Sequence, residues 1–201
     1  MTTSNRDALL HLLSRISFKL GDFTLSSGAK SDYYIDCRIT TLHAEGARLT
    51  GLALLDLLHQ HKLSPAAVGG LTMGADPVVS AVSIASAWRA AEHPNNHHPL
   101  IHGFLVRKAE KAHGTGRRIE GFFEEGAPVV IVDDVCTTGA STINAIDAAK
   151  QAGMKVIGAL CLVEREAKGR AAVEAACEGA PFLSLYTAND VRAAHVAQLA
   201  M

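Results

Sequence analysis

From about residue 62 onward, short segments that are apolar throughout alternate with longer segments that have the residue spacing of helices. The apolar segments are 66–71, 100–106, 128–132, 155–163 and 181–186, and the helical ones are 75–91, 139–152, 168–177 and a terminal helix. Strands that are apolar on both sides belong to a parallel sheet, because helices cover both of its faces. The pattern therefore predicts an α/β fold with an open, mainly parallel, twisted sheet and helices on both faces. In such folds, ligands bind at the carboxyl ends of the strands, near the point where the strand order reverses.

The first 61 residues follow a different pattern. Segment 4–17 carries one apolar stripe at helical spacing, and segment 43–61 is a leucine-rich helix. Between them, segments 18–27 and 33–38 read as two short strands around a Ser26-Ser27-Gly28 turn. We expect a single domain over residues 1–201, in which about 1–40 form a small N-terminal hood and about 62–186 form the core sheet.

Composition excludes several classes of protein. Hydrophobic residues make up 48% of the chain and charged residues 19%, which is typical of a globular protein and excludes global disorder. The net charge of -1 is unlike that of a strongly basic nucleic-acid-binding protein, and no apolar run approaches the roughly 18–20 residues that span a bilayer. The four cysteines form no Cys-x-x-Cys pair and the N-terminus lacks the pattern of a signal peptide. These features predict a soluble, cytoplasmic protein that binds neither nucleic acid nor a membrane.

The segment VVIVDDVCTTGAST at residues 129–142 carries the strongest chemical signal. A buried strand is followed by a loop with the hydroxyl groups of Thr137, Thr138 and Ser141, and Gly139 allows a tight turn before a helix begins. The first backbone N–H groups of a helix have no partner within the helix and are suited to binding phosphate. We therefore predict a phosphate site on this loop. It is not a Walker loop, because Gly-x-x-x-x-Gly-Lys-Ser/Thr is absent.

Asp133 and Asp134 need a different explanation, because carboxylates repel phosphate. Carboxylates accept hydrogen bonds from sugar hydroxyls, and they also bind magnesium. Either role is consistent with a ligand that carries a sugar diol and a metal-bound group beside its phosphate.

Segment 129–142 resembles the phosphoribosyl pyrophosphate (PRPP) motif of type I phosphoribosyltransferases. Three further segments resemble the orotate phosphoribosyltransferases within that group: FTLSSGAKSDYYIDCR at 23–38, GGLTMGADP at 69–77 and RKAEKAHG at 107–114. Together the motifs cover roughly residues 18–170. The resemblance implies a type I phosphoribosyltransferase-like fold and the magnesium-dependent transfer of the 5-phosphoribosyl group from PRPP to orotate. The products would be orotidine 5'-monophosphate and pyrophosphate, in pyrimidine biosynthesis.

The resemblance also assigns roles to individual residues. The two aspartates would bind the ribose hydroxyls, the 137–141 loop the 5'-phosphate, and the 107–121 loop would cover the pyrophosphate. The implied PRPP-binding residues are Arg107, Lys108, Lys111, His113, Asp133, Asp134, Val135, Cys136, Thr137, Thr138, Gly139, Ala140 and Ser141. The implied catalytic residues among them are Lys108, Lys111, His113, Asp133 and Asp134. Mg2+ would enter bound to PRPP, with no direct protein ligand assigned.

The base would be held elsewhere. The resemblance gives orotate contacts to Thr137 and Arg165, and a base contact to the pair Tyr33 and Tyr34. Because neighbouring residues alternate across a strand, we expect only one of the two tyrosines to face the ligand.

Further expectations concern assembly and backbone. The resemblance implies a homodimer with shared active sites, in which the 107–121 loop reaches the partner subunit. It also indicates a strained or cis non-proline peptide near residues 71–73. Some relatives have lysines at the positions of Ser26 and Met73, so those two contacts are not carried over.

Alternatives remain at this point. A purine phosphoribosyltransferase would share segment 129–142 but should lack the 107–114 motif and an arginine for a carboxylate. A non-catalytic, PRPP-sensing regulator would need a nucleic-acid surface, against which the balanced charge argues. Arg165 could pair with Glu164 or Glu166 at the surface rather than with orotate. Cys136 has no evident histidine base, which favours a structural role over that of a nucleophile.

Overall fold

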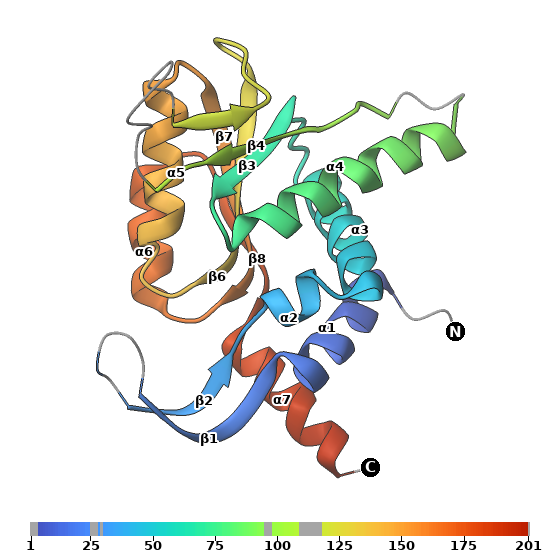
Figure 1. Ribbon diagram of the computed structural model, residues 1–201, viewed down its shortest axis with the longest axis vertical. Coiled ribbons are helices and arrows are strands. Elements are labelled where there is room, and N and C mark those ends of the chain that lie inside the picture. Colours follow the sequence, from blue (N-terminus) through green and yellow to red (C-terminus); the bar gives the residue numbers. More distant parts are fainter. Residues whose placement is uncertain (1–3, 25–27, 29, 95–97, 109–117, 201) are drawn as a thin grey trace.

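The computed structural model describes residues 4–24, 28, 30–94, 98–108 and 118–200, and its main feature is a six-stranded sheet with the strand order β5-β4-β3-β6-β7-β8 (Figure 1). The strands are β3 (Ala67–Leu71), β4 (His102–Val106), β5 (Ile119–Gly121), β6 (Pro128–Cys136), β7 (Lys155–Glu164) and β8 (Phe182–Thr187). All neighbouring strands are parallel except β4 and β5, which are antiparallel. The prediction of a mainly parallel sheet is confirmed. The strand order reverses between β3 and β6. The glycine-rich segment lies at the carboxyl end of β3, and the aspartate pair lies at the carboxyl end of β6.

Helices cover both faces of this sheet (Figure 1). On one face lie α3 (Ala44–Gln60) and α4 (Ala75–Glu92), and on the other lie α5 (Ala140–Gln151) and α6 (Ala167–Ala176). The side chains of β6 divide between the two cores: Val130 and Val132 pack on the first, and Val129 and Ile131 on the second. All four are buried, which is why β6 is apolar throughout residues 129–132.

A smaller layer, which we call the hood, lies beneath the carboxyl ends of the strands (Figure 1). It contains α1 (Asn5–Ile16), the antiparallel pair β1 (Phe18–Thr24) and β2 (Lys30–Ile35), and also the last helix, α7 (Ala188–Leu199). The ring nitrogen Nδ1 of His195 is 2.8 Å from the carbonyl oxygen of Ser14, and the Arg192 guanidinium is 2.7 Å from the Asp32 carboxylate. The N-terminal elements contribute to the hood as expected, and the last helix, which was not assigned to it from the sequence, packs there as well.

Two strands differ in length from the sequence-based expectation. β6 continues from residue 132 to Cys136, because Val135 and Cys136 pair with Val163 and Glu164 of β7. The two aspartates therefore belong to the strand, whereas the sequence placed them after it. β2 ends at Ile35 rather than at residue 38, because the chain turns there into a short helix.

Two short elements were not predicted. β5, at the edge of the sheet, occupies the end of the segment that we expected to be a loop, and α2 (Arg38–Thr41) follows β2. Elements of three and four residues are too short to show a hydrophobic period.

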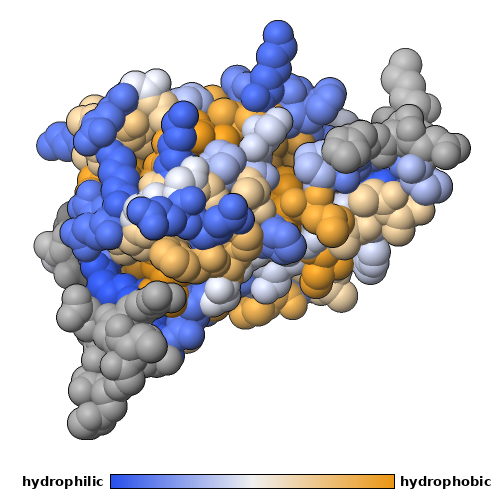
Figure 2. Space-filling view, turned by 90° about the horizontal axis from the view of Figure 1, so that it is seen from above, coloured by the Kyte–Doolittle hydropathy of each residue, from blue (hydrophilic) through white to orange (hydrophobic). Residues whose placement is uncertain are grey.

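No helix among the described residues has the length and apolar character needed to cross a membrane. Viewed from the end of the sheet opposite the hood, hydrophilic side chains project from a surface that also shows apolar areas (Figure 2).

Candidate functional site

A cavity of about 330 Å³ lies at the carboxyl ends of the central strands. It takes its walls from β2, α2, the β3–α4 turn, the ends of β6 and β7 and the start of α5. The lining residues are Tyr34, Ile35, Asp36, Cys37, Arg38, Leu71, Thr72, Met73, Gly74, Lys108, Asp133, Asp134, Val135, Thr137, Ser141 and Arg165. The structure thus brings together residues from four of the motifs, at the place where an α/β sheet binds its ligands.

The aspartate pair lies at the end of β6, where Asp133 is buried and Asp134 is half-buried. Asp133 is 5% exposed; its carboxylate accepts hydrogen bonds from the Thr142 hydroxyl at 2.9 Å and from the Asp134 backbone N–H at 3.0 Å. One oxygen of the Asp134 carboxylate accepts a hydrogen bond from the Val135 N–H at 2.9 Å. Burial raises the pKa of Asp133, and the charge of Asp134 raises it further; burial also raises the pKa of Asp134. Two desolvated carboxylates at this position favour a ligand that brings hydroxyl donors or a cation.

The loop between β6 and α5 has the geometry of an anion site. Gly139 precedes α5 with a φ of 80°, and a Cβ atom there would lie 2.8 Å from the Val173 side chain, so glycine is required for two reasons. Thr137 and Ser141 line the cavity. Thr138 is exposed, and its hydroxyl accepts a long hydrogen bond of 3.4 Å from the Ala140 N–H. The predicted loop with a glycine turn and a helix behind it is confirmed; its contact with phosphate stays a prediction.

Arg165, at the end of β7, points toward β2. It donates a hydrogen bond to the Ser31 hydroxyl at 3.2 Å, and its guanidinium lies 4.9 Å from the centre of the Tyr33 ring. Glu164, the neighbour with which it could have paired, instead binds Arg170 through two hydrogen bonds of 2.6 and 2.8 Å. The cation–π contact with Tyr33 and the hydrogen bond to Ser31 hold the Arg165 guanidinium at the cavity wall. Its positive charge therefore remains available to a ligand.

The two tyrosines separate as expected for neighbours on a strand. Tyr33 stacks on Phe18, with 5.5 Å between the ring centres. The Arg165 guanidinium also packs against the Tyr33 ring. Tyr34 lines the cavity and is 41% exposed. Of the pair, Tyr34 is the residue placed to contact a base.

The 107–121 loop contributes one described cation to the cavity. This cation is Lys108, which lines the cavity. The Arg107 guanidinium instead lies 2.9 Å from the Glu120 carboxylate of β5, and Arg107 does not line the cavity. The β4–β5 pairing, which the sequence did not predict, draws Arg107 to that carboxylate. Lys111 and His113 lie outside the described residues.

Cys136 faces the hydrophobic core rather than the cavity. Its side chain is 1% exposed and packs among the core residues of the α5–α6 face, and burial raises the pKa of its thiol to about 11. These properties agree with a structural side chain and not with a nucleophile.

The glycine-rich segment after β3 closes the cavity from the other side. The Thr72–Met73 peptide bond is cis, within the range expected from the sequence. A Cβ atom on Gly74 would lie 2.5 Å from an Asp134 carboxylate oxygen, so only glycine allows this turn to approach the aspartate pair.

Sequence reasoning missed three polar residues. The Thr142 hydroxyl donates a hydrogen bond to the Asp133 carboxylate. Asp36 and Arg38 form an ion pair in the cavity wall. Thr142 falls inside the recognised segment but was not given a role. Asp36 and Arg38 end the 23–38 motif, and nothing in the hydrophobic pattern marks them.

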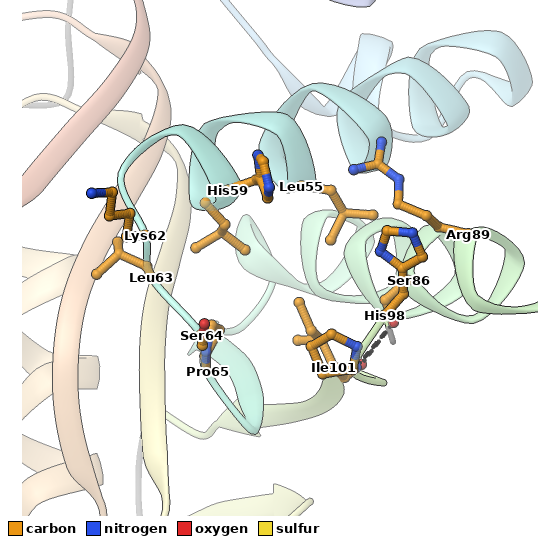
Figure 3. Close-up of a pocket in the computed structure, with 12 residues that line it drawn as sticks. Leu55, His59, Lys62, Leu63, Ser64, Pro65, Ser86, Arg89, His98 and Ile101 are labelled. Carbon is orange, nitrogen blue, oxygen red and sulfur yellow. Dashed lines mark hydrogen bonds between the residues drawn. The ribbon is translucent and has the colours of Figure 1, made fainter. Parts of the chain in front are cut away.

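A second cavity, of about 380 Å³, lies at the opposite end of the sheet, before β3 and β4 (Figure 3). Its polar groups serve the fold: Arg89 donates to the Asp56 carboxylate at 2.9 Å, and the Ser86 hydroxyl accepts from the Ile101 N–H at 3.0 Å. Among the described residues, none from the 129–142 segment lines it. The cavity at the carboxyl ends is therefore the candidate active site.

Comparisons with known proteins agree with this placement. The Phosphoribosyl transferase domain model matches residues 118–179. The orotate phosphoribosyltransferase of Thermosynechococcus vestitus is 42% identical over 189 residues, which cover 94% of this chain and 93% of that protein. The orotate phosphoribosyltransferase of Rhodopirellula baltica is 37% identical over 194 residues, covering 94% and 95%.

A solved structure is similar over nearly its whole length. The crystal structure of Mycobacterium tuberculosis H37Rv orotate phosphoribosyltransferase in complex with PRPP has a TM-score of 0.74 and 33% sequence identity, and the match covers 94% of this chain and 99% of that one. Identity at this level over nearly the whole of both chains shows that this protein belongs to the orotate phosphoribosyltransferase family.

Proposed function

We propose that this protein transfers the 5-phosphoribosyl group of PRPP to orotate, giving orotidine 5'-monophosphate and pyrophosphate in pyrimidine biosynthesis. The observation that carries the proposal is the convergence of three features on one cavity. They are the anion loop that begins at Thr137, the carboxylate pair Asp133 and Asp134, and Arg165, which forms no ion pair with a carboxylate among the described residues. Family membership supports the same reaction.

PRPP fits the β6–α5 part of the cavity. The loop 137–141 would receive the 5'-phosphate on its hydroxyls and on the free N–H groups of α5. The carboxylates of Asp133 and Asp134 would accept hydrogen bonds from the ribose hydroxyls, which relieves the cost of their burial.

Mg2+ is consistent with this site, because carboxylate oxygens are ligands that it prefers and it keeps several ligands from water or substrate. Asp133 and Asp134 are the residues that would face the ion as it arrives with PRPP. When bound, the ion supplies positive charge to the departing pyrophosphate.

The reaction needs positioning more than it needs a reactive side chain. Displacement at the anomeric carbon passes through an oxocarbenium-like state, as glycoside hydrolysis does. Orotate provides the nucleophile, so holding the two substrates in line lowers the barrier by about 7–11 kcal/mol. Lys108, together with Lys111 and His113 of the same loop, would stabilise the charge that builds up on pyrophosphate.

Orotate fits the wall that β2 and β7 share. Arg165 would form a charge-assisted pair with its carboxylate, Tyr34 would contact the ring, and Thr137 would add a hydrogen bond. Purine bases carry no carboxylate, so this arginine also favours orotate over a purine.

The direct test follows orotate by its ultraviolet absorbance. Purified protein should consume orotate only when PRPP and Mg2+ are both present, and omission of either should stop the change. Consumption of adenine or guanine instead would support the purine alternative. Binding of PRPP with no turnover of any base would support the regulator.

Replacement of Arg165 by leucine should weaken orotate affinity by roughly ten- to hundredfold, because a charge-assisted hydrogen bond contributes about 1.5–3 kcal/mol. PRPP affinity should change little, since its groups bind other walls of the cavity. Titration of each substrate separately provides the measurement, with Arg165→Lys as the charge-retaining control. Equal losses of both affinities would mean that Arg165 acts through the fold.

A homodimer with shared active sites is the assembly we propose. Its support is a largely apolar groove between α3 and α4, lined by Ala47, Leu52, Ile84 and Trp88, of which Ile84 and Trp88 are 52% and 57% exposed. Large exposed side chains of this kind mark interaction surfaces when they gather. A second copy of the chain on this face would cover these side chains, and the sharing of sites rests on the family resemblance.

Mixing two inactive variants tests the sharing of sites. Lys111→Ala removes a loop cation and Asp134→Asn removes a carboxylate of the cavity, so a mixed dimer would contain one site made of two intact halves. We expect partial recovery of activity after subunit exchange. Each variant mixed with itself serves as the control, and differently sized tags confirm that mixed dimers form. No recovery in proven mixed dimers would show that each loop serves its own subunit.

A cytoplasmic location completes the proposal. All four cysteines are free and buried, which is usual for proteins in a reducing compartment.

A further inference from the structure

Arg38 is a charged residue that lines the cavity and has no role in the reaction as proposed. It begins α2, an element that packs against α3 and α4, and its side chain is 46% exposed at the cavity wall. Among the described lining residues, the other cations are Lys108 and Arg165. Arg38 therefore provides a third positive charge in a cavity that is proposed to receive a polyanion.

Asp36 fixes the plane of the Arg38 guanidinium. Arg38 Nε donates to one carboxylate oxygen of Asp36 and Nη2 to the other, both at 2.9 Å, and the Arg38 backbone N–H donates to the same carboxylate at 3.1 Å. This side-on pair uses two of the five N–H groups that a guanidinium carries, so the three on its far edge remain for a ligand. An arginine held in this way loses little further conformational entropy when it binds phosphate oxygens.

The remaining walls determine which group Arg38 can serve. The 5'-phosphate is placed at the 137–141 loop, and the orotate carboxylate at Arg165 beside Tyr33. Asp133 and Asp134 also line the cavity, and the charge of Arg38 acts on Asp134, opposing the effect of burial on its pKa. The pyrophosphate of PRPP has been given only Mg2+ and the cations of the 107–121 loop as partners, and the remaining wall of the cavity consists of α2 and the turn at residues 71–74.

We propose that Arg38 binds the pyrophosphate group of PRPP and that Asp36 is the positioning residue that orients it. The inference rests on the proposed function, which it deepens by assigning a residue to one end of the substrate. Lys108 follows β4, whereas Arg38 begins α2, so the two cations reach the cavity from different elements.

Three ligands separate this role from a structural one. In the presence of Mg2+, Arg38→Gln should bind PRPP and inorganic pyrophosphate roughly ten- to hundredfold more weakly, the range for loss of a charge-assisted hydrogen bond. Ribose 5-phosphate, which has the sugar and the 5'-phosphate but no diphosphate, should bind within about twofold of the wild-type affinity. Arg38→Lys should recover part of the loss, and Asp36→Asn should raise the KM for PRPP while leaving the KM for orotate unchanged.

The matched control is Arg89→Gln, which breaks an arginine–aspartate pair of the same 2.9 Å length outside this cavity. It should leave all three affinities unchanged. Normal pyrophosphate affinity in folded Arg38→Gln would overturn the inference, as would an equal loss for all three ligands. If Arg38→Gln does not fold, Arg38→Lys and Asp36→Asn provide the same comparison. Wild-type protein that fails to consume orotate with PRPP would reject the proposed function itself, a result separate from the pyrophosphate titrations.

Discussion

Asp133→Asn should give a protein that is more stable than the wild type and almost inactive. The Asp133 carboxylate is buried beside a second carboxylate, and both features raise its pKa. An amide of the same shape carries no charge; its oxygen still accepts from the Asp134 N–H, and its NH2 group donates to the Thr142 hydroxyl, which becomes the acceptor. We expect the free energy of unfolding at pH 8 to rise by on the order of 1–3 kcal/mol. Turnover should fall by about ten- to hundredfold or more, because a hydrogen bond to an ionised group contributes about 1.5–3 kcal/mol.

The raised pKa of Asp133 determines how the free energy of unfolding changes with pH. A carboxyl group with a raised pKa in the folded state binds more protons when folded than when unfolded, so the wild type loses stability as the pH rises. The loss begins above the ordinary aspartate pKa of about 3.9 and continues to the raised pKa of Asp133. Since the variant lacks this loss, the stability difference between the two proteins should be large at pH 8 and small near pH 4.

Thermal unfolding at a series of pH values, with activity assays alongside, measures both effects. Asp147→Asn is the control, because Asp147 is an exposed aspartate on α5 outside the cavity. A variant less stable than the wild type at pH 8 would contradict the prediction. So would a stability difference that does not change with pH.

The second large effect is expected at the anion loop. Thr138→Asp places a negative charge beside Gly139, at the position assigned to the 5'-phosphate. Two unit charges about 4 Å apart repel by about 4 kcal/mol at an effective dielectric constant of 20, which corresponds to roughly a thousandfold in affinity. PRPP and ribose 5-phosphate should both lose affinity, whereas pyrophosphate should lose much less.

The fold should survive this change, because Thr138 is exposed and aspartate can also accept the hydrogen bond from the Ala140 N–H. Circular dichroism and calorimetric titration test the two expectations, and Thr138→Ser, which keeps the hydroxyl, is the matched control. Unchanged PRPP affinity in folded Thr138→Asp would remove the phosphate site from this loop.

Much of the core and part of the site could be predicted from the sequence, because the determinants are local. The apolar run at 129–132, the paired aspartates and Gly139 stand within eleven residues, and they form the end of β6, the loop and the start of α5. The buried strands were recognisable because every position faces a core. The end of β6 was misjudged because backbone pairing with β7 extends it through two polar residues, which hydrophobicity does not show.

The features that were missed depend on contacts between distant residues or on very short elements. Arg165 and Ser31 are 134 positions apart, and Arg192 and Asp32 are 160 apart, so no spacing rule connects them. The family resemblance assigned Arg107 to PRPP, and its pairing with Glu120 follows from β5, a strand of three residues. A motif does not show which partner an arginine takes without ligand.

The packing of α7 on α1 has a consequence for the order in which the protein is made. A ribosome releases α1, β1 and β2 first, and the sheet from β3 to β8 follows. The backbone oxygen of Ser14 and the ring of Phe18 meet His195 only when the last helix has emerged. The hood that carries Tyr34 and braces Arg165 is therefore finished last, so a growing chain holds an assembled phosphate loop before it holds a complete place for the base.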